Sequence, residues 1–344
     1  MYFVEARGLE VEIGQAQGES LREPICEIVD RLSVEIMQVQ GIGIQDVLHR
    51  LAPYVAHMER ELPHLAQEVH GISQGAKIAY LEAQLLNYQG EARLRQLDGC
   101  TSFAITSADQ QHTIIGQNVD MPPLFAGMNR IMHVTPTEGL PFVMWGIVGT
   151  VGQRGVNADG LALVGNGLGG PPWKPGISSI VADRVVLESS TIDEAIARVR
   201  QLTRAKATNM LLADVSGRII DVEWTPSEER ILVADGAIAH SNCYVHHDFA
   251  ITEAVPLPGL DDAPNRQKRA DLLLDTVDRN ADLLPSIVSL LSDHEDYPRS
   301  ICRHNVERPY PYVTTASIIA LLPDRVLMAA DGGPCRSPYA RFAV

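Results

Sequence analysis

Basic residues are scarce in this sequence. It has 28 Lys and Arg against 43 Asp and Glu, which gives a formal net charge of −15 and a pI near 5.1. No basic run is longer than Lys268-Arg269, whereas nucleic-acid binders carry a basic patch and anionic membranes repel an acidic surface. Long hydrophobic runs are also missing, since no stretch approaches the ~18 consecutive apolar residues of a membrane span. The sequence therefore predicts no nucleic-acid partner and no membrane partner.

Cysteine is sparse as well. The five cysteines are Cys26, Cys100, Cys243, Cys302 and Cys335. An odd number of scattered cysteines is typical of a reducing compartment. Residues 1–7 lack the basic start and apolar run of a secretory signal. We therefore expect a cytoplasmic protein. No Cys-x-x-Cys pair occurs, and the polar runs at 246–248 and 293–296 lack the histidine spacing of zinc sites. The sequence therefore predicts solvated loops at both runs, no metal and no cofactor.

The organisation of the chain changes near residue 100. Apolar residues recur at helical spacing over 22–95, which predicts three amphipathic helices. Short apolar runs separated by turn signals follow, and they predict strands. The expected strands are 101–106, 113–117, 130–135, 142–148, 161–164, 209–214, 218–224, 230–233, 237–241, 315–322 and 325–330, with helices at 178–187, 192–202, 266–277 and 281–291. Strand clusters separated by helix pairs indicate sheets layered between helices.

Two glycine-rich motifs resemble known sites without the context that those sites need. The G-x-S-x-G motif around Ser73 matches a nucleophile elbow, which requires a preceding strand, but here a helical stripe precedes it. We expect a helix that ends at Gly71 and a new helix after it, with a Ser73 hydrolase as the alternative. The run at 165–170 lacks the βαβ unit that must follow a dinucleotide loop, so we expect no nucleotide site, and the Gly- and Pro-rich stretch 165–176 predicts a surface loop.

Cys100 stands where the helical pattern gives way to strands, directly after Gly99. A cysteine at the start of a strand is usually a small buried hydrophobic residue. If the Gly99–Cys100 bond were cut, however, Cys100 would gain an α-amine with a pKa near 7.7–8.0. One residue would then carry a nucleophile and a general base within reach of each other.

Several short motifs, in the right order over nearly the whole chain, resemble one family. They are Asp98-Gly-Cys100-Thr, Gly116-Gln-Asn118-Val-Asp120, Gly155-Val-Asn157, Asn166, His240-Ser-Asn242-Cys, Asn265-Arg266 and Tyr297-Pro-Arg-Ser-Ile-Cys302-Arg303. Together they resemble the isopenicillin-N acyltransferase family, also known as acyl-CoA:6-aminopenicillanic acid acyltransferases or peptidase family C45. This family is a branch of the N-terminal-nucleophile (Ntn) hydrolases. The resemblance implies an α+β fold, the four-layer αββα sandwich, and no cofactor.

The resemblance also implies roles for particular residues. Cys100 is the nucleophile, with Gly99–Cys100 as the self-cleavage site and the freed α-amine as the general base. Asn242 is the oxyanion donor, although a cysteine follows it where the family has histidine, and Asp120 lies near the nucleophile, although valine precedes it where the family has tryptophan. Arg303 lines the site, where it orients the cleavage-site backbone, holds Asp120 or binds an acidic substrate. A purely structural Asp120–Arg303 pair is the alternative.

We therefore predict an autoproteolytic amide hydrolase, made as a zymogen, that cleaves the C–N bond of a small N-acyl amide or peptide-like conjugate. The alternatives are an acyltransferase that moves an acyl group from a thioester or amide to an amine, and an uncleaved, non-catalytic binding protein. Segments 1–99 (helical) and 100–344 (catalytic) would stay together as an intertwined heterodimer, with homo-oligomers also possible. Candidate pocket residues are Phe125, Met144 and Trp145, which core packing explains equally well.

Overall fold

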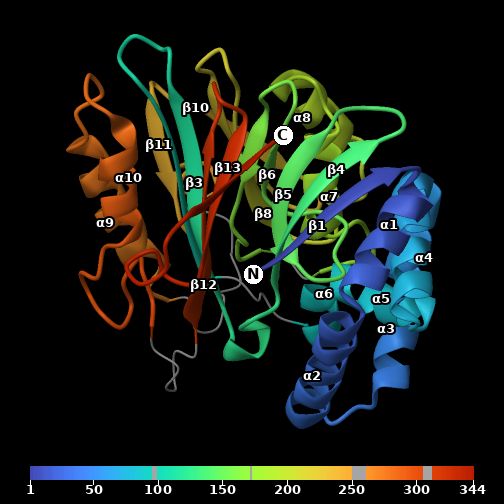
Figure 1. The fold of residues 1–344 in the computed structure, drawn as a ribbon. Coiled ribbons are helices and arrows are strands. Elements are labelled where there is room, and N and C mark those ends of the chain that lie inside the picture. The colour runs from blue at the N-terminus through green and yellow to red at the C-terminus, as the bar shows by residue number, and fades with distance from the viewer. Residues whose placement is uncertain (95–98, 171–172, 250–260, 305–311) are drawn as a thin grey trace.

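Two β-sheets face one another, with helices packed outside both, in the computed structural model of the chain (Figure 1). The structure describes residues 1–94, 99–170, 173–249, 261–304 and 312–344. Helices α9 (Ala263–Asp275) and α10 (Leu283–Leu291) cover one sheet. Helices α7 (Ser179–Leu187) and α8 (Ile192–Arg200) and the N-terminal helices cover the other. The expected α+β fold, a four-layer αββα sandwich, is confirmed.

The larger sheet has eight strands in the order β1-β4-β5-β6-β7-β8-β9-β10. Its strands are β1 (Tyr2–Gly8), β4 (Asn129–Pro136), β5 (Phe142–Ile147), β6 (Gly155–Asn157), β7 (Ala162–Val164), β8 (Thr208–Ala213), β9 (Ile219–Trp224) and β10 (Glu229–Val233). β1 pairs in parallel with β4, and the other neighbours are antiparallel. The segment predicted to be helical thus also supplies an edge strand to this sheet.

The smaller sheet has six antiparallel strands in the order β11-β2-β3-β12-β13-β14. Its strands are β2 (Gly99–Thr106), β3 (Thr113–Met121), β11 (Ala237–His240), β12 (Val313–Leu321), β13 (Val326–Asp331) and β14 (Ala340–Ala343). Every residue of the central strands β2 and β3 is buried, because one face meets the other sheet and the opposite face meets α9 and α10.

All of the expected strands and the four later helices are found, with ends that differ by a few residues. The later helices are α7 (Ser179–Leu187), α8 (Ile192–Arg200), α9 (Ala263–Asp275) and α10 (Leu283–Leu291), and a short 3₁₀ turn spans Pro123–Phe125. Apolar residues of α9 and α10 form a separate core with Phe103, Ile105 and Ile319. Strands β1, β6 and β14 were not predicted. β1 and β14 lie at the edges of their sheets, and β6 has only three residues.

The N-terminal helices number more than the three that were predicted. They are α1 (Glu10–Ser20), α2 (Arg22–Gln40), α3 (Ile44–Glu61), α4 (Pro63–Ala76), α5 (Tyr80–Asn87) and α6 (Gln89–Arg93). The prediction of a helix end at Gly71 is wrong, because α4 runs through to Ala76. A Cβ on Gly71 would lie 2.1 Å from the Val11 carbonyl oxygen of α1. The absence of a side chain at Gly71 therefore allows α1 and α4 to cross closely.

The same packing explains the G-x-S-x-G motif without an elbow. Ser73 lies inside α4, where its hydroxyl donates to the His70 carbonyl at 2.8 Å. A Cβ on Gly75 would meet the Gln15 carbonyl oxygen at 2.5 Å. Because a nucleophile elbow requires a sharp turn between a strand and a helix, the Ser73 alternative has no structural basis.

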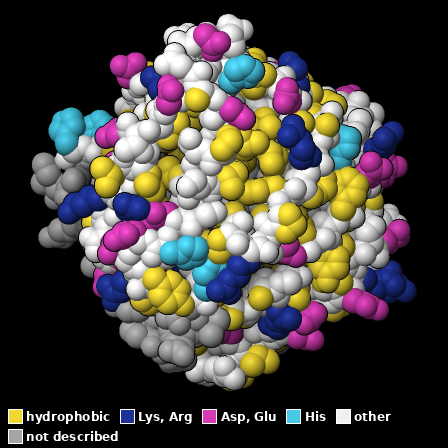
Figure 2. All heavy atoms as spheres, turned by 60° about the vertical axis from the view of Figure 1, so that its left-hand side comes forward, with side chains coloured by type: hydrophobic (Ala, Val, Ile, Leu, Met, Phe, Trp, Pro, Cys, Tyr) yellow, Lys and Arg dark blue, Asp and Glu magenta, His cyan; other side chains and the backbone are white. Residues whose placement is uncertain are grey.

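The surface mixes side chains of different types. On the face shown in Figure 2, Lys and Arg side chains are scattered among acidic and hydrophobic ones. No helix in the described part of the chain is long and apolar enough to cross a membrane.

Candidate active site

Cys100 is held through its backbone on both sides. It lies in β2, opposite Val119 of β3, and is fully buried. Its N–H donates to Asn242 Oδ1 at 2.8 Å, and its carbonyl oxygen accepts from Arg266 Nη1 at 2.5 Å. β2 begins at Gly99, so the expected cleavage site lies at the start of this strand. The nitrogen that cleavage would free thus already has a defined partner.

Asn242 lies just after β11 and uses both ends of its amide. Its oxygen accepts from Cys100 N–H and from Arg266 Nη2, both at 2.8 Å, and its Nδ2 donates to the Gly167 carbonyl at 3.0 Å. Two donors converging on one atom identify that atom as the oxygen. Residues 165–169, which include Gly167, are buried beside the site. The prediction of a surface loop is therefore wrong for these residues.

A chain of buried ion pairs runs from Cys100 to Asp120. Arg266 Nε lies 3.2 Å from Asp262 Oδ1, and Arg303 Nη2 lies 2.7 Å from Asp262 Oδ2. Arg303 Nε then lies 3.2 Å from Asp120 Oδ2. Thr314 completes the chain, since its hydroxyl donates to Asp120 Oδ1 at 2.7 Å and accepts from Arg303 N–H at 2.8 Å. The structure therefore brings Cys100, Asn242, Arg303 and Asp120 into one network.

The charges in this network balance when both carboxylates are ionised, because two arginines face two aspartates. All four side chains are almost completely buried, and buried charges persist in proteins only when they are paired in this way. Burial raises the pKa of Asp120 to about 6, against the opposing pull of Arg303 and Arg266. Of the roles expected for Arg303, the geometry provides the one that holds Asp120, while Arg266 orients the backbone of Cys100.

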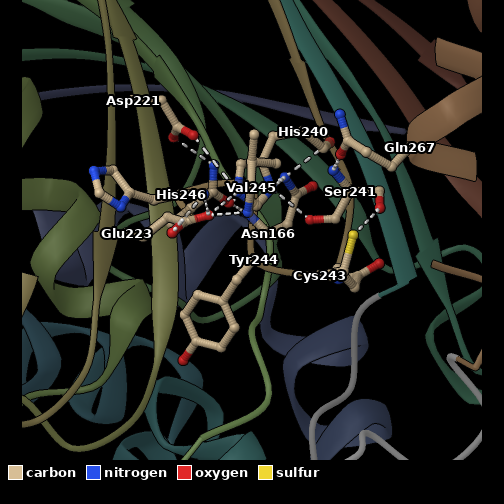
Figure 3. Close-up of polar contacts among 12 residues, drawn as sticks. Asn166, Asp221, Glu223, His240, Ser241, Cys243, Tyr244, Val245, His246 and Gln267 are labelled. Atoms are coloured by element: carbon tan, nitrogen blue, oxygen red, sulfur yellow. Dashed lines mark hydrogen bonds and ion pairs between the residues drawn. The ribbon is translucent and has the colours of Figure 1, made fainter. Parts of the chain in front are cut away.

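A second buried cluster lies between the sheets (Figure 3). His240 Nε2 of β11 lies 3.0 Å from Glu223 Oε1 and 3.5 Å from Asp221 Oδ2, both on β9. Burial lowers the pKa of His240, but the two carboxylates outweigh that effect, so its pKa lies above the ordinary value. Burial also raises the pKa of Asp221 to about 6. The positive imidazolium therefore offsets part of the buried negative charge.

This second cluster fixes the segment that carries Asn242. The Val245 N–H donates to Glu223 Oε1 at 2.5 Å, just after Asn242 in the chain. Just before Asn242, Ser241 N–H donates to Gln267 Oε1 at 2.7 Å. Asn242 is thus clamped from the larger sheet on one side and from α9 on the other.

Asn166 connects the two sheets at the same level. Its Nδ2 donates to Ser102 Oγ of β2 at 2.8 Å and to the His240 carbonyl of β11 at 3.2 Å. Its N–H donates to Asn209 Oδ1 of β8 at 2.5 Å. This asparagine, which the family resemblance singled out, therefore has a structural position in the site.

A comparison with known protein families identifies the family of the chain. A family model described as acyl-coenzyme A:6-aminopenicillanic acid acyl-transferase matches residues 106–326, well over half of the chain. The chain belongs to this acyl-transferase family. Membership identifies it as an enzyme that acts on amide bonds, as a hydrolase or an acyltransferase. The matched segment contains Asp120, Asn242 and Arg303, and Cys100 lies before it.

Solved structures that match this chain include a penicillin V acylase and a conjugated bile acid hydrolase. Penicillin V acylase from Agrobacterium tumefaciens is 17% identical with a TM-score of 0.47, over 67% of this chain and 83% of that one. A mutant of conjugated bile acid hydrolase from Clostridium perfringens is 13% identical with a TM-score of 0.49, over 71% and 92% of the two chains. No curated protein sequence matches the chain.

The three predicted pocket residues of this family member are all buried in the main core. Phe125 lies beneath the Arg93 guanidinium, 5.8 Å from it, and Met144 and Trp145 lie in β5. A cavity of about 600 Å³ in the described part of the chain is lined by residues such as His112, Arg279 and others at the far end of β2 and β3. Neither the candidate catalytic residues nor Phe125, Met144 and Trp145 line this cavity. The pocket role of these three core residues therefore stays a prediction.

Sequence reasoning assigned no role to several members of the site. Arg266 appears in the resemblance, but it stands in the charged run Arg266-Gln-Lys-Arg269, which has the composition of a solvated helix face. Its pairing with Asp262 at i,i+4 was the available signal. Asp221 and Glu223 alternate along β9 in the manner of a strand's solvent face, yet both are fully buried.

Proposed function

We propose that this chain is an autoproteolytic amide hydrolase whose nucleophile and general base both belong to Cys100. The observation that carries the proposal is a pair of hydrogen bonds that hold Cys100 at once: its N–H donates to Asn242, and its carbonyl accepts from Arg266. Burying a charged side chain such as Arg266 costs free energy unless the charge is paired. Its use to hold the backbone of Cys100 therefore favours a chemical role for this residue.

Maturation would begin at the Gly99 carbonyl carbon. The Cys100 sulfur attacks this carbon, an S–C bond forms, the C–N bond breaks, and the nitrogen takes the thiol proton. Water then hydrolyses the thioester to give a Gly99 carboxylate and a free Cys100 thiol. Arg266 supports this step because it holds the Cys100 carbonyl, and with it the orientation of the nucleophile's backbone.

In the mature enzyme the freed amine would accept the thiol proton as the thiolate attacks a substrate amide. The amine product leaves with that proton, and water resolves the acyl-enzyme. Asn242 Oδ1 already accepts a hydrogen bond from this nitrogen, which leaves the amine's lone pair available for the thiol. Asn242 Nδ2 carries two N–H groups, so donation from one of them to an oxyanion does not require loss of the bond that the other makes to Gly167.

Acyl transfer remains the second candidate, because the matching family model is that of an acyl-transferase. The two reactions share the acyl-enzyme and differ in whether water or an amine resolves it. The proposed substrate class is a small N-acyl amide, and the two fragments would stay associated as a heterodimer.

The first experiment is the intact mass of the purified protein. At 37.6 kDa for 344 residues, cleavage before Cys100 gives fragments of about 11 and 27 kDa. We expect two fragments for the wild type and a single chain for Cys100→Ala. Cys26→Ala is the matched control, since Cys26 lies in α2 away from the site, and it should cleave normally.

A single wild-type chain that stays intact on prolonged incubation, with Cys100→Ala identical to it, would overturn the proposal and favour a binding protein. If cleavage occurs, the cleaved protein is given a panel of N-acyl amides with and without an ordinary primary amine as acceptor. Free acid alone in both cases indicates hydrolysis, and a new amide of the added amine formed at the expense of acid indicates acyl transfer.

A further inference from the structure

Four side chains with metal-binding atoms converge outside the active site. His294 follows α10, Cys302 and His304 precede β12, and Cys335 lies between β13 and β14. Their four nitrogen and sulfur atoms all lie within 4.8 Å of one another. The sequence predicted a solvated loop and no metal here, because the residues are spread over more than forty positions and the spacing of common zinc motifs is absent.

The separations resemble the edges of a tetrahedron around one ion. The two sulfurs are 3.7 Å apart, the two Nε2 atoms are 3.1 Å apart, and His304 Nε2 lies 3.5 Å from Cys302 Sγ and 3.0 Å from Cys335 Sγ. Zn–S bonds of ~2.3 Å and Zn–N bonds of ~2.05 Å give tetrahedral edges of about 3.8 Å between sulfurs, about 3.3 Å between nitrogens and about 3.6 Å between the two types. Three of the four measured edges agree within about 0.2 Å on that basis.

The backbone around the cluster brings these ligands together. The Cys302 N–H donates to the Asp293 carbonyl at 3.0 Å, which ties the Cys302 segment to the residue before His294. Gly333 closes the opposite side, because a Cβ there would lie 2.7 Å from His304 Cε1 and 3.0 Å from Cys302 Sγ. His294 and Cys335 are exposed, while Cys302 is buried, so an ion would have access from solvent.

We propose that His294, Cys302, His304 and Cys335 form a structural Zn²⁺ site. Two thiolates and two neutral imidazoles are a common set of ligands for structural zinc, and a complete set of four protein ligands leaves no open position for catalysis. Binding releases the two thiol protons to solvent, so that two thiolates balance the charge of the ion. No electron transfer is involved.

The site has a direct connection to the network around Asp120. Arg303 stands between the ligands Cys302 and His304, and its guanidinium holds both Asp120 and Asp262. Zinc would fix the backbone on either side of Arg303 by binding both neighbours. The metal is therefore a positioning element for Arg303 and takes no part in the chemistry of Cys100.

The test is the metal content of the full chain after loading with one equivalent of ZnCl₂ and desalting against a weak chelator. We expect about one zinc per chain in the wild type and a loss of most of it in Cys335→Ser and in His294→Ala. Cys26→Ser and His49→Ala are matched controls on α2 and α3, and both should keep the metal. Because the readout is metal content, it stands apart from the Cys100 proposal.

Two further measurements define the outcome. In Co²⁺-loaded wild type we expect the absorption bands of tetrahedral cobalt with thiolate ligands, and their loss in Cys335→Ser. The five cysteines should titrate as thiols once zinc is released under denaturing conditions. A wild type without zinc would overturn the proposal, whatever the number of thiols. If only three thiols titrate, a Cys302–Cys335 disulfide is present instead of a metal site. Loss of zinc in the controls to the same degree would also overturn it.

Discussion

Replacing Asp120 with asparagine tests how its buried carboxyl titrates. The comparison is made in a Cys100→Ala background, so that parent and variant are both single uncleaved chains. The asparagine side chain has nearly the shape of a protonated aspartic acid and carries no charge at any pH. The difference in unfolding free energy between parent and variant therefore follows the protonation of this one carboxyl, since all other groups are shared.

The direction of the effect follows from the pKa of Asp120, which burial raises from 3.8 to about 6. Between these two values the folded chain keeps a proton that the unfolded chain has lost, so rising pH favours unfolding. The parent's stability relative to the variant is highest below about pH 4 and falls as the pH rises through about 6. A pKa difference of about two corresponds to about 3 kcal/mol.

The assay is urea unfolding followed by circular dichroism at several pH values from about 4 to about 7, with the parent as the reference. We expect the parent to lose about 2.5 kcal/mol relative to Asp120→Asn over this range, because the rest of the difference lies outside it. A relative stability that rises with pH would refute the reasoning. It would mean that Arg303 and Arg266 outweigh burial and hold the pKa of Asp120 below its ordinary value.

Three other predictions concern the helices and the Cys100 clamp. Gly71→Ala should lower the free energy of unfolding, measured by urea titration, by about 1–3 kcal/mol because its Cβ meets the backbone of α1. Gln67→Ala, at an exposed position of the same helix, should change it by less than about 0.5 kcal/mol. Equal effects of the two substitutions would contradict the packing argument. Ser73→Ala should leave self-cleavage and amide hydrolysis unchanged by gel and product assay, and loss of either would restore the serine alternative. Arg266→Lys should slow self-cleavage about tenfold to a hundredfold, because lysine cannot hold Asn242 and the Cys100 carbonyl together; wild-type kinetics on a gel would contradict this role.

Much of the fold could be predicted from local patterns. Strands such as β2 and β3 are short apolar runs bounded by turn residues, and the later helices have clear apolar stripes. The failures are informative. Edge strand β1 was not recognised because its pairing with β4 lies more than 120 residues away in the chain. The glycines of α4 suggested a helix end because a close crossing with α1 cannot be inferred from α4 alone.

The site was predictable where a short motif carries the chemistry, and not where distant segments meet. Cys100 and Asn242 were singled out by motifs, and the structure joins them through one hydrogen bond. Asp221 and Glu223 look like solvent-facing residues of a strand, and only the second sheet, which brings His240 against them, makes them buried partners. Likewise, the cysteines predicted to be scattered include two whose sulfurs are 3.7 Å apart.

The parallel pairing of β1 with β4 has a consequence for how the protein can be produced. Without residues 1–94, β4 would present an open row of backbone donors and acceptors, which is the geometry that recruits other chains into aggregates. The N-terminal segment thus acts as a donor strand for the rest of the molecule. Residues 100–344 made alone should be insoluble, and supplying the missing segment as a separate polypeptide during refolding should rescue them, as in a split-protein complementation pair.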